Sequence, residues 1–146
     1  MALEFVTTYD PKSIVVTAGG IPLVMFADDT KIELEHPSAE FDEQVLCGGG
    51  TVLVATNDSR IHAKIHLDQT SPSNDVLNGF WTMWKTTRKG FPLVVKDTMG
   101  TTTIMTAQAF IRKVTPLKYG KKSEGRTWEL TLLNSTETIG GNIPTV

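Results

Sequence analysis

Apolar residues fall on every second position of the segment from Ser59 to Leu67, and basic residues fall between them. The apolar members are Ile61, Ala63, Ile65 and Leu67, and the basic ones are Arg60, His62, Lys64 and His66. Successive side chains of a strand point to opposite faces of a sheet. The segment is therefore predicted to be a half-buried β-strand.

The residues after this strand indicate an α-helix. Ser71 offers an acceptor side chain, Pro72 suits the first turn, and Asp75 lies near the positive end of the helix dipole. Apolar and aromatic residues then recur at helical spacing, and the basic stretch from Lys85 to Gly90 ends the helix. The residues that we expect to anchor this helix on a sheet are Leu77, Phe80, Trp81 and Trp84. An exposed aromatic platform for a ligand is the alternative interpretation of the same stripe.

The rest of the chain reads mostly as short strands separated by turn residues. The further strands are predicted at Ser13–Thr17, Ile21–Phe26, Lys31–Glu35, Thr51–Ala55, Phe91–Asp97, Thr101–Val114 and Arg126–Leu133. Glycines at 19 and 20 suit the tight turn of a hairpin. The predicted fold is mainly β, an antiparallel β-sandwich or small barrel with one flanking α-helix, formed by a single domain over residues 1–146.

Two segments do not follow a strand or helix pattern. Residues 36–50 contain Pro37, end in three glycines and form an unusually long loop, and such loops are often functional. As candidates for contacts between copies we single out Pro37, Phe41, Leu46, Gly48, Gly49 and Gly50. A merely mobile loop is the alternative. Residues 134–146 are expected to form a flexible tail that orders against a neighbouring subunit.

Composition restricts the possible classes of function. The 146 residues carry a formal net charge of −2, which disfavours binding of nucleic acid through a basic surface. Cys47 is the single cysteine, so an intrachain disulfide and a cysteine-based metal site are excluded. We find neither a signal-peptide pattern nor an apolar run long enough to cross a membrane, and expect no membrane contact.

The candidate chemical motifs do not form a reactive site. His62 and His66 share a strand face, but four residues of strand separate their Cβ atoms by ~13 Å, which is too far for one metal ion. Asp28 and Asp29 are adjacent and should point to opposite faces, and the glycines at 48–50 lack phosphate-loop spacing. No serine lies in a nucleophile-elbow motif. We therefore expect no catalytic residue, no metal and no cofactor, and rank a hydrolase last among the possible functions.

Several phrases in the sequence resemble the tail tube protein of contractile-tailed bacteriophages. The most specific is Gln69-Thr-Ser-Pro-Ser-Asn-Asp-Val-Leu77, followed by Phe91-Pro-Leu-Val-Val-Lys-Asp97 and the turn at 100–102. The opening Tyr9-Asp-Pro-Lys-Ser-Ile-Val-Val-Thr17, the stretches at 19–23 and 26–29, and Gly125-Arg-Thr-Trp-Glu-Leu130 extend the similarity over residues 9–133.

The resemblance implies a non-enzymatic structural subunit that forms hexameric rings stacked into a tube for the genome. It implies a location in the virion tail after synthesis in the host cytoplasm, with copies of itself, the tail sheath, the baseplate and the tail terminator as partners. A monomeric β-rich module that binds a small ligand is the alternative function.

A conduit for DNA is expected to repel the polyanion from its lining. The candidates for lining the bore are Glu33, Glu35, Asp97 and Glu129. The basic side chains are then expected to face outward or to pair at subunit interfaces, namely Arg60, Lys64, Arg112, Lys113, Lys118, Lys121 and Lys122.

Overall fold

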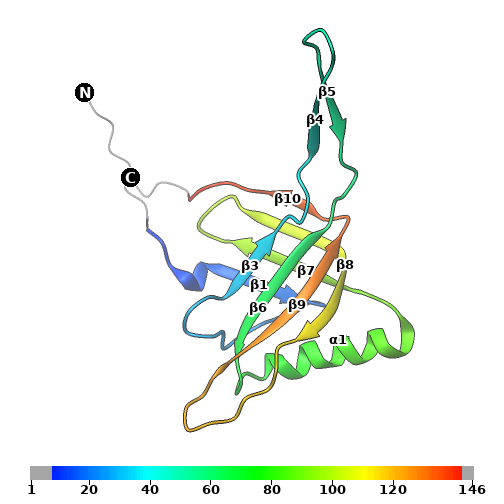
Figure 1. The fold of residues 1–146 in the computed structure, drawn as a ribbon. Helices are drawn as coiled ribbons and strands as arrows, with labels where there is room; N and C mark the ends of the chain where they lie inside the picture. The colour runs from blue at the N-terminus through cyan, green and yellow to red at the C-terminus, as the bar shows by residue number, and fades with distance from the viewer. Residues whose placement is uncertain (1–7, 143–146) are drawn as a thin grey trace, which may run out of the picture.

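A computed structural model describes residues 8–142, which form an eight-stranded antiparallel sheet, a separate two-stranded hairpin and one α-helix (Figure 1). The strand order in the large sheet is β2-β1-β7-β8-β9-β6-β3, and β10 pairs with β8. The bounds are β1 Ile14–Ala18, β2 Ile21–Pro22, β3 Ile32–Glu35, β4 Phe41–Val45, β5 Thr51–Ala55, β6 Ile61–Asp68, α1 Ser73–Thr87, β7 Phe91–Asp97, β8 Thr103–Val114, β9 Gly125–Leu133 and β10 Thr136–Thr138. A short 3₁₀ turn, Pro11–Ser13, precedes β1.

The predicted alternation sets the two faces of the central strands. In β6 the apolar positions are buried and the positions between them are partly or fully exposed. β6 pairs with β9 so that Ile65 lies opposite Trp128 and Ala63 lies opposite Leu130. Side chains that lie opposite one another in an antiparallel pair share a face. One face of these strands therefore enters the core and the other remains polar.

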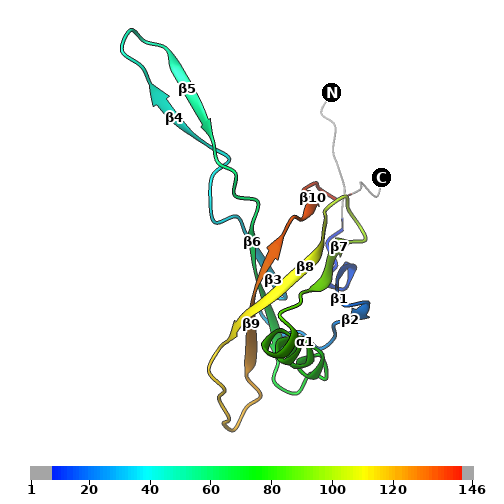
Figure 2. The ribbon, with the colours of Figure 1, turned by 90° about the vertical axis from the view of Figure 1, so that its right-hand side faces the viewer.

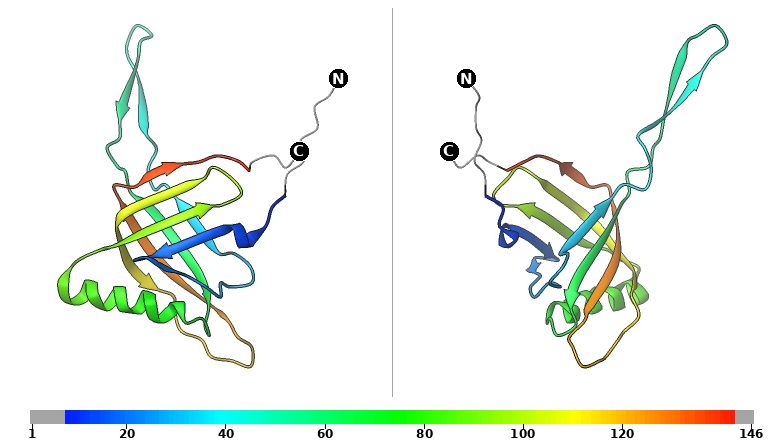
Figure 3. Two further views of the ribbon diagram at one scale, coloured as in Figure 1. Left: turned by 180° about the vertical axis from the view of Figure 1, so that it is seen from behind. Right: turned by 60° about the vertical axis from the view of Figure 1, so that its left-hand side comes forward.

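The long strand β8 forms the corner of the sheet. Its first half pairs with β7 and β10, and its second half pairs with β9. The register shifts between Phe91 and Leu93 in β7 and between Ile111 and Lys113 in β8. Such bulges bend a sheet and increase its twist. The β1-β7 half consequently lies across the core from the β6-β9 half, as Figure 3 shows from two sides.

The helix α1 lies along one end of the bent sheet (Figure 1). Leu77 is fully buried, and the ring of Phe80 stacks on Phe91 with 4.3 Å between the ring centroids. Gly19 has a positive φ, and a Cβ atom there would lie 2.3 Å from the Phe80 ring. The helix ends at Thr87, and Arg88 caps it in the left-handed conformation, within the stretch from Lys85 to Gly90 that we expected to end it. Glycine at 19 is thus required for the close approach of Phe80 to the β1–β2 turn.

The fold class is confirmed as mainly β and antiparallel with one flanking helix, but two expected segments differ. The expected loop at 36–50 contains a strand, β4, which pairs with β5 in a hairpin outside the large sheet. Part of the expected tail, Thr136–Thr138, forms β10 on β8, while residues 143–146 lie outside the described residues. The expected strand at 21–26 is reduced to β2, because Met25 has a positive φ that extended backbone does not allow.

Candidate assembly surface

The β4–β5 hairpin projects away from the body of the molecule, as the side view in Figure 2 shows most clearly. Every residue in its two strands is exposed, including large apolar side chains such as Val45 at 75% and Leu53 at 59%. An isolated two-stranded hairpin is marginally stable in water, and contiguous exposed apolar side chains are typical of contact surfaces. The hairpin is thus built as an arm that another surface is expected to cover.

The tip of the hairpin explains the run of three glycines. Gly48 and Gly49 have φ values of +101° and +95°. The N–H of Leu46 donates to the carbonyl oxygen of Gly50 at 2.7 Å, which closes the turn. Cys47 is exposed at this tip. The glycines therefore form a tight turn, at backbone angles that side chains rarely adopt.

The root of the hairpin is held by a cluster of polar contacts. The Thr56 N–H donates to the Glu40 carbonyl oxygen at 2.8 Å, and Ser38 Oγ donates to Asp58 Oδ2 at 2.7 Å. Arg60 donates from Nε and Nη2 to the two Asp58 oxygens, each at 2.8 Å. The hydrogen bonds from Arg60, and then that from Ser38, hold the pKa of Asp58 well below its usual range. The ionised carboxylate thereby links the two sides of the root, at Ser38 and at Arg60.

A second contact ties the root to the C-terminal segment. His36 Nε2 lies 2.8 Å from Glu137 Oε1, on β10. An open polar hollow of about 350 Å³ lies here, bordered by Asn57, Asp58 and Ser135 among others. The hollow is polar and has no apolar walls that would bury a ligand, which is unlike most small-molecule sites.

The polar face of β3, β6, β9 and β8 carries charges that alternate in sign across the strands. Glu33 lies opposite Lys64, Lys64 opposite Glu129, and Glu129 opposite Lys113. The Lys113 Nζ to Glu129 Oε2 distance is 3.4 Å, and the Lys64 Nζ to Glu129 Oε1 distance is 3.9 Å. The face is therefore close to charge-balanced. We expected Lys64 and Lys113 to lie away from the acidic candidates for the bore. The strand register instead places these lysines on the same face as Glu33 and Glu129.

The four acidic candidates for the bore do not form one surface. Glu33 and Glu35 alternate with half-buried positions on β3, and Glu129 is on the same polar face. Asp97 ends β7 and accepts hydrogen bonds from Ser13 Oγ at 3.2 Å and from the Met99 N–H at 3.0 Å. Its geometry is that of a turn-stabilising carboxylate, and its place in the lining stays a prediction.

The four helix anchors differ in depth. Leu77 is fully buried, whereas Phe80, Trp81 and Trp84 are partly exposed. Trp81 meets Trp128 edge to face at 6.0 Å, and Trp84 meets Phe110 at 5.1 Å. The rings of Trp81 and Trp84 therefore pack against aromatic rings of the sheet.

Between residues 8 and 142 no group of three or more His, Cys, Asp or Glu side chains is arranged to hold a metal ion. No helix in this range is long and apolar enough to cross a membrane.

Sequence reasoning selected Phe41, Leu46 and the glycines of this arm but missed its apolar positions Val45 and Leu53 and its acidic ones, Asp42 and Glu43. A signal for the acidic ones was available, because residues 36–59 contain neither lysine nor arginine.

Comparison with known proteins shows what this chain is similar to. No family model matches the sequence. The structural protein ORF10 of Pseudomonas phage KPP10 is 26% identical over 145 residues, which covers 93% of this chain and 84% of the relative.

Three solved structures share the fold at low sequence identity. The tube-terminating cap of the anti-feeding prophage matches with a TM-score of 0.66 at 10% identity, covering 94% of this chain and 95% of the cap chain. A chain of the sheath/tube terminator of PVC, an extracellular contractile injection system, matches with a TM-score of 0.59 at 12% identity over 94% and 100% of the two chains. A chain of the PVC sheath–tube complex matches with a TM-score of 0.56 at 11% identity over 89% and 88%.

The fold is thus that of proteins from contractile tails, and the relative is a phage structural protein. Together they support the resemblance to phage tail proteins found in the sequence.

Proposed function

We propose that this protein is the subunit of a contractile-type phage tail tube, assembled as hexameric rings that stack around a channel for the genome. The observation that carries the proposal is the projecting β4–β5 arm, whose exposed apolar side chains need a partner surface. Double-stranded DNA would pass through the channel without specific binding. The protein would be made in the host cytoplasm and would join the tail sheath, baseplate and terminator in the virion tail.

The edges of the large sheet support ring formation. The sheet ends in β2 on one side and β3 on the other, each only a few residues long. Unpaired strand edges are a ready-made surface for pairing with another chain. A head-to-tail contact that closes by rotation gives a ring, and a second contact along the axis gives a tube. The edges would supply the first contact and the arm the second.

A terminating ring is the second candidate. Of the solved structures described above, the tube-terminating cap and the sheath/tube terminator both have higher TM-scores than the chain from the sheath–tube complex. A terminator would form one ring that ends a tube and would not polymerise. This candidate differs from the first in the number of axial contacts that each copy makes.

Negative-stain microscopy of the purified protein distinguishes the candidates. Tubes of uniform diameter support the tube subunit, and single rings that do not stack at any concentration support the terminator. Particles of about 16 kDa at all concentrations would overturn both and favour the monomeric ligand-binding module.

A further inference from the structure

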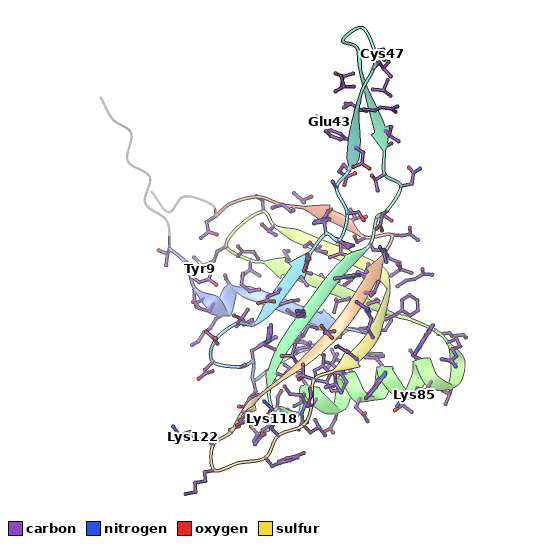
Figure 4. All side chains as sticks on the ribbon, in the orientation of Figure 1. Tyr9, Glu43, Cys47, Lys85, Lys118 and Lys122 are labelled. Atoms are coloured by element: carbon purple, nitrogen blue, oxygen red, sulfur yellow. The ribbon has the colours of Figure 1, made fainter. Side chains whose placement is uncertain are left out.

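Opposite ends of the molecule carry opposite charge. The arm end holds Glu40, Asp42 and Glu43, with no lysine or arginine between residues 36 and 57. The β8–β9 loop, residues 115–124, holds Lys118, Lys121 and Lys122 against one acidic residue, Glu124. Figure 4 shows Glu43 and Cys47 at one end and Lys118 and Lys122 at the other, with the sheet between them. The chain as a whole is nearly neutral, so its acidic and basic residues are separated in space, and neither sign greatly exceeds the other.

The basic loop also has the apolar character that the arm requires in a partner. Leu117 is 56% exposed and Tyr119 is 77% exposed, although both are large. Leu117 borders a groove that continues between α1 and the sheet, lined also by Trp81, Val114 and Trp128. The arm is apolar and acidic, and this surface is apolar and basic.

The basic loop is anchored to the body and does not hang free. Ser123 Oγ donates to both oxygens of Asp68, at 2.8 and 2.7 Å, and the Gln69 N–H donates to the Glu124 carbonyl oxygen at 3.0 Å. Arg126 Nη2 donates to Tyr119 Oη at 3.3 Å. A surface held in this way loses less conformational freedom on binding, which favours association.

We propose that the β4–β5 arm of one copy docks on the β8–β9 loop of the next copy along the axis. The apolar tip lies against Leu117 and Tyr119, and Asp42 and Glu43 face Lys118, Lys121 and Lys122. This inference rests on the proposed tube function. It adds the surface that receives the arm and the pairing of acidic side chains on the arm with basic side chains on the loop. Because the two surfaces are different parts of the same chain, the contact repeats without closing and sets one polarity for the whole stack. A copy added upside down would bring like charges together and be rejected.

Charge exchange tests the pairing. The arm variant Asp42→Lys/Glu43→Lys and the loop variant Lys121→Glu/Lys122→Glu should each lower the association constant for stacking about tenfold or more, because exposed ion pairs become like-charge contacts. One chain carrying all four substitutions restores opposite charges and should stack like the parent. The matched control combines the arm reversal with Lys12→Glu/Lys96→Glu, which makes the same charge change on exposed lysines elsewhere and should not restore stacking.

Cross-linking supplies a measurement that does not depend on charge. Cys47 lies at the tip of the arm and is the single cysteine of the chain. In the variant Tyr119→Cys, mild oxidation with diamide should join Cys47 of one copy to the new thiol of the next. Each chain then bonds to two neighbours, and a non-reducing gel should show a ladder of trimers, tetramers and longer species. The parent and Cys47→Ser/Tyr119→Cys have one thiol each and should stop at dimers.

The outcomes separate this inference from the proposed function. One outcome is that the parent forms tubes while the fourfold variant fails to restore stacking and the gel shows no ladder beyond dimers. That result would overturn the arm-to-loop contact and leave the tube function intact. A parent that never stacks would overturn the tube function itself. Circular dichroism shows whether each variant is folded. If the charge reversals unfold the chain, they are replaced by the neutral variant Lys118→Gln/Lys121→Gln/Lys122→Gln. This variant should weaken stacking. Unchanged stacking of that folded variant would contradict the inference.

Discussion

At the scale of single residues, the carboxylate of Asp58 joins the two sides of the root of the arm. Its pKa is lowered because Arg60 and Ser38 donate hydrogen bonds to the ionised form. Ionisation is therefore favoured more in the folded chain than in the unfolded one. The stabilisation of the root is complete above the ordinary pKa of aspartate and is lost only as the pH falls below that value.

We predict that Arg60→Leu raises the pKa of Asp58 toward the ordinary aspartate value of 3.8, because it removes the largest cause of the shift. Ser38→Ala should raise it by less, since Ser38 donates one hydrogen bond and carries no charge. Carbon-detected NMR titration of the carboxyl group measures both. An equal effect of the two substitutions would contradict the assigned order of causes.

Asn74 is a second residue with a large expected effect. It is buried, its Oδ1 accepts from Trp128 Nε1 at 2.9 Å, and its Nδ2 donates to the Asp68 carbonyl oxygen at 2.9 Å. Asn74→Ala leaves these groups without partners in the interior. We expect a loss of about 1–3 kcal/mol in the free energy of unfolding. Denaturant unfolding checks this, with Asn78→Ala on the exposed side of the same helix as the control, which should cost about 0.5 kcal/mol or less.

At the scale of elements, the arm is expected to be separable from the body. The Glu40–Thr56 hydrogen bond already brings the two sides of the root together. Replacing residues 41–55 by Asn-Gly should therefore give a folded, soluble protein whose thermal stability is within about 1 kcal/mol of the parent, because no core side chain is removed. The same protein should form no tubes.

Thermal unfolding and microscopy of this deletion variant decide the point. The control Val45→Thr/Leu53→Thr keeps the full arm but removes two exposed apolar side chains, and should weaken stacking without abolishing it. Normal tubes from the deletion variant would show that the arm is not the axial contact.

The elements differ in how well the sequence predicted them, and burial explains the difference. β6 and α1 each have one face in the core, so their apolar residues recur with the period of the element. β4, Phe-Asp-Glu-Gln-Val, has no buried face and hence no such pattern. Its strand conformation depends on pairing with β5 and on the glycine turn between them.

The candidate site was predictable only in part for a related reason. The glycines and Phe41 marked residues 36–50 as a contact segment, and the structure places them on one arm. That Glu43 and Lys121 lie at opposite ends depends on tertiary structure, which spacing along the chain does not reveal. The pairing of Lys64 with Glu129 likewise depends on the register between β6 and β9.

At the scale of the whole molecule, charge balance bears on the passage of DNA. If the polar face of β3, β6 and β9 lines the bore, its acidic groups are largely matched by lysines, so phosphates meet neither a basic trap nor a strongly repulsive wall. We predict that purified tubes do not retain double-stranded DNA in filter binding at about 50–200 mM salt. Over this range, proteins that bind DNA through its phosphates lose affinity steeply as the salt concentration rises. Tight binding that weakens steeply with salt would contradict this.

The slender root of the arm has a mechanical consequence. The body is an eight-stranded bent sheet with a helix packed on it, whereas the arm leaves it as a ribbon two strands wide. A narrow ribbon twists and bends under a smaller load than a wide, packed sheet. In a tube joined ring to ring by such ribbons, curvature would be taken up at the joints while each ring kept its bore. The tail could then flex sideways without pinching the channel.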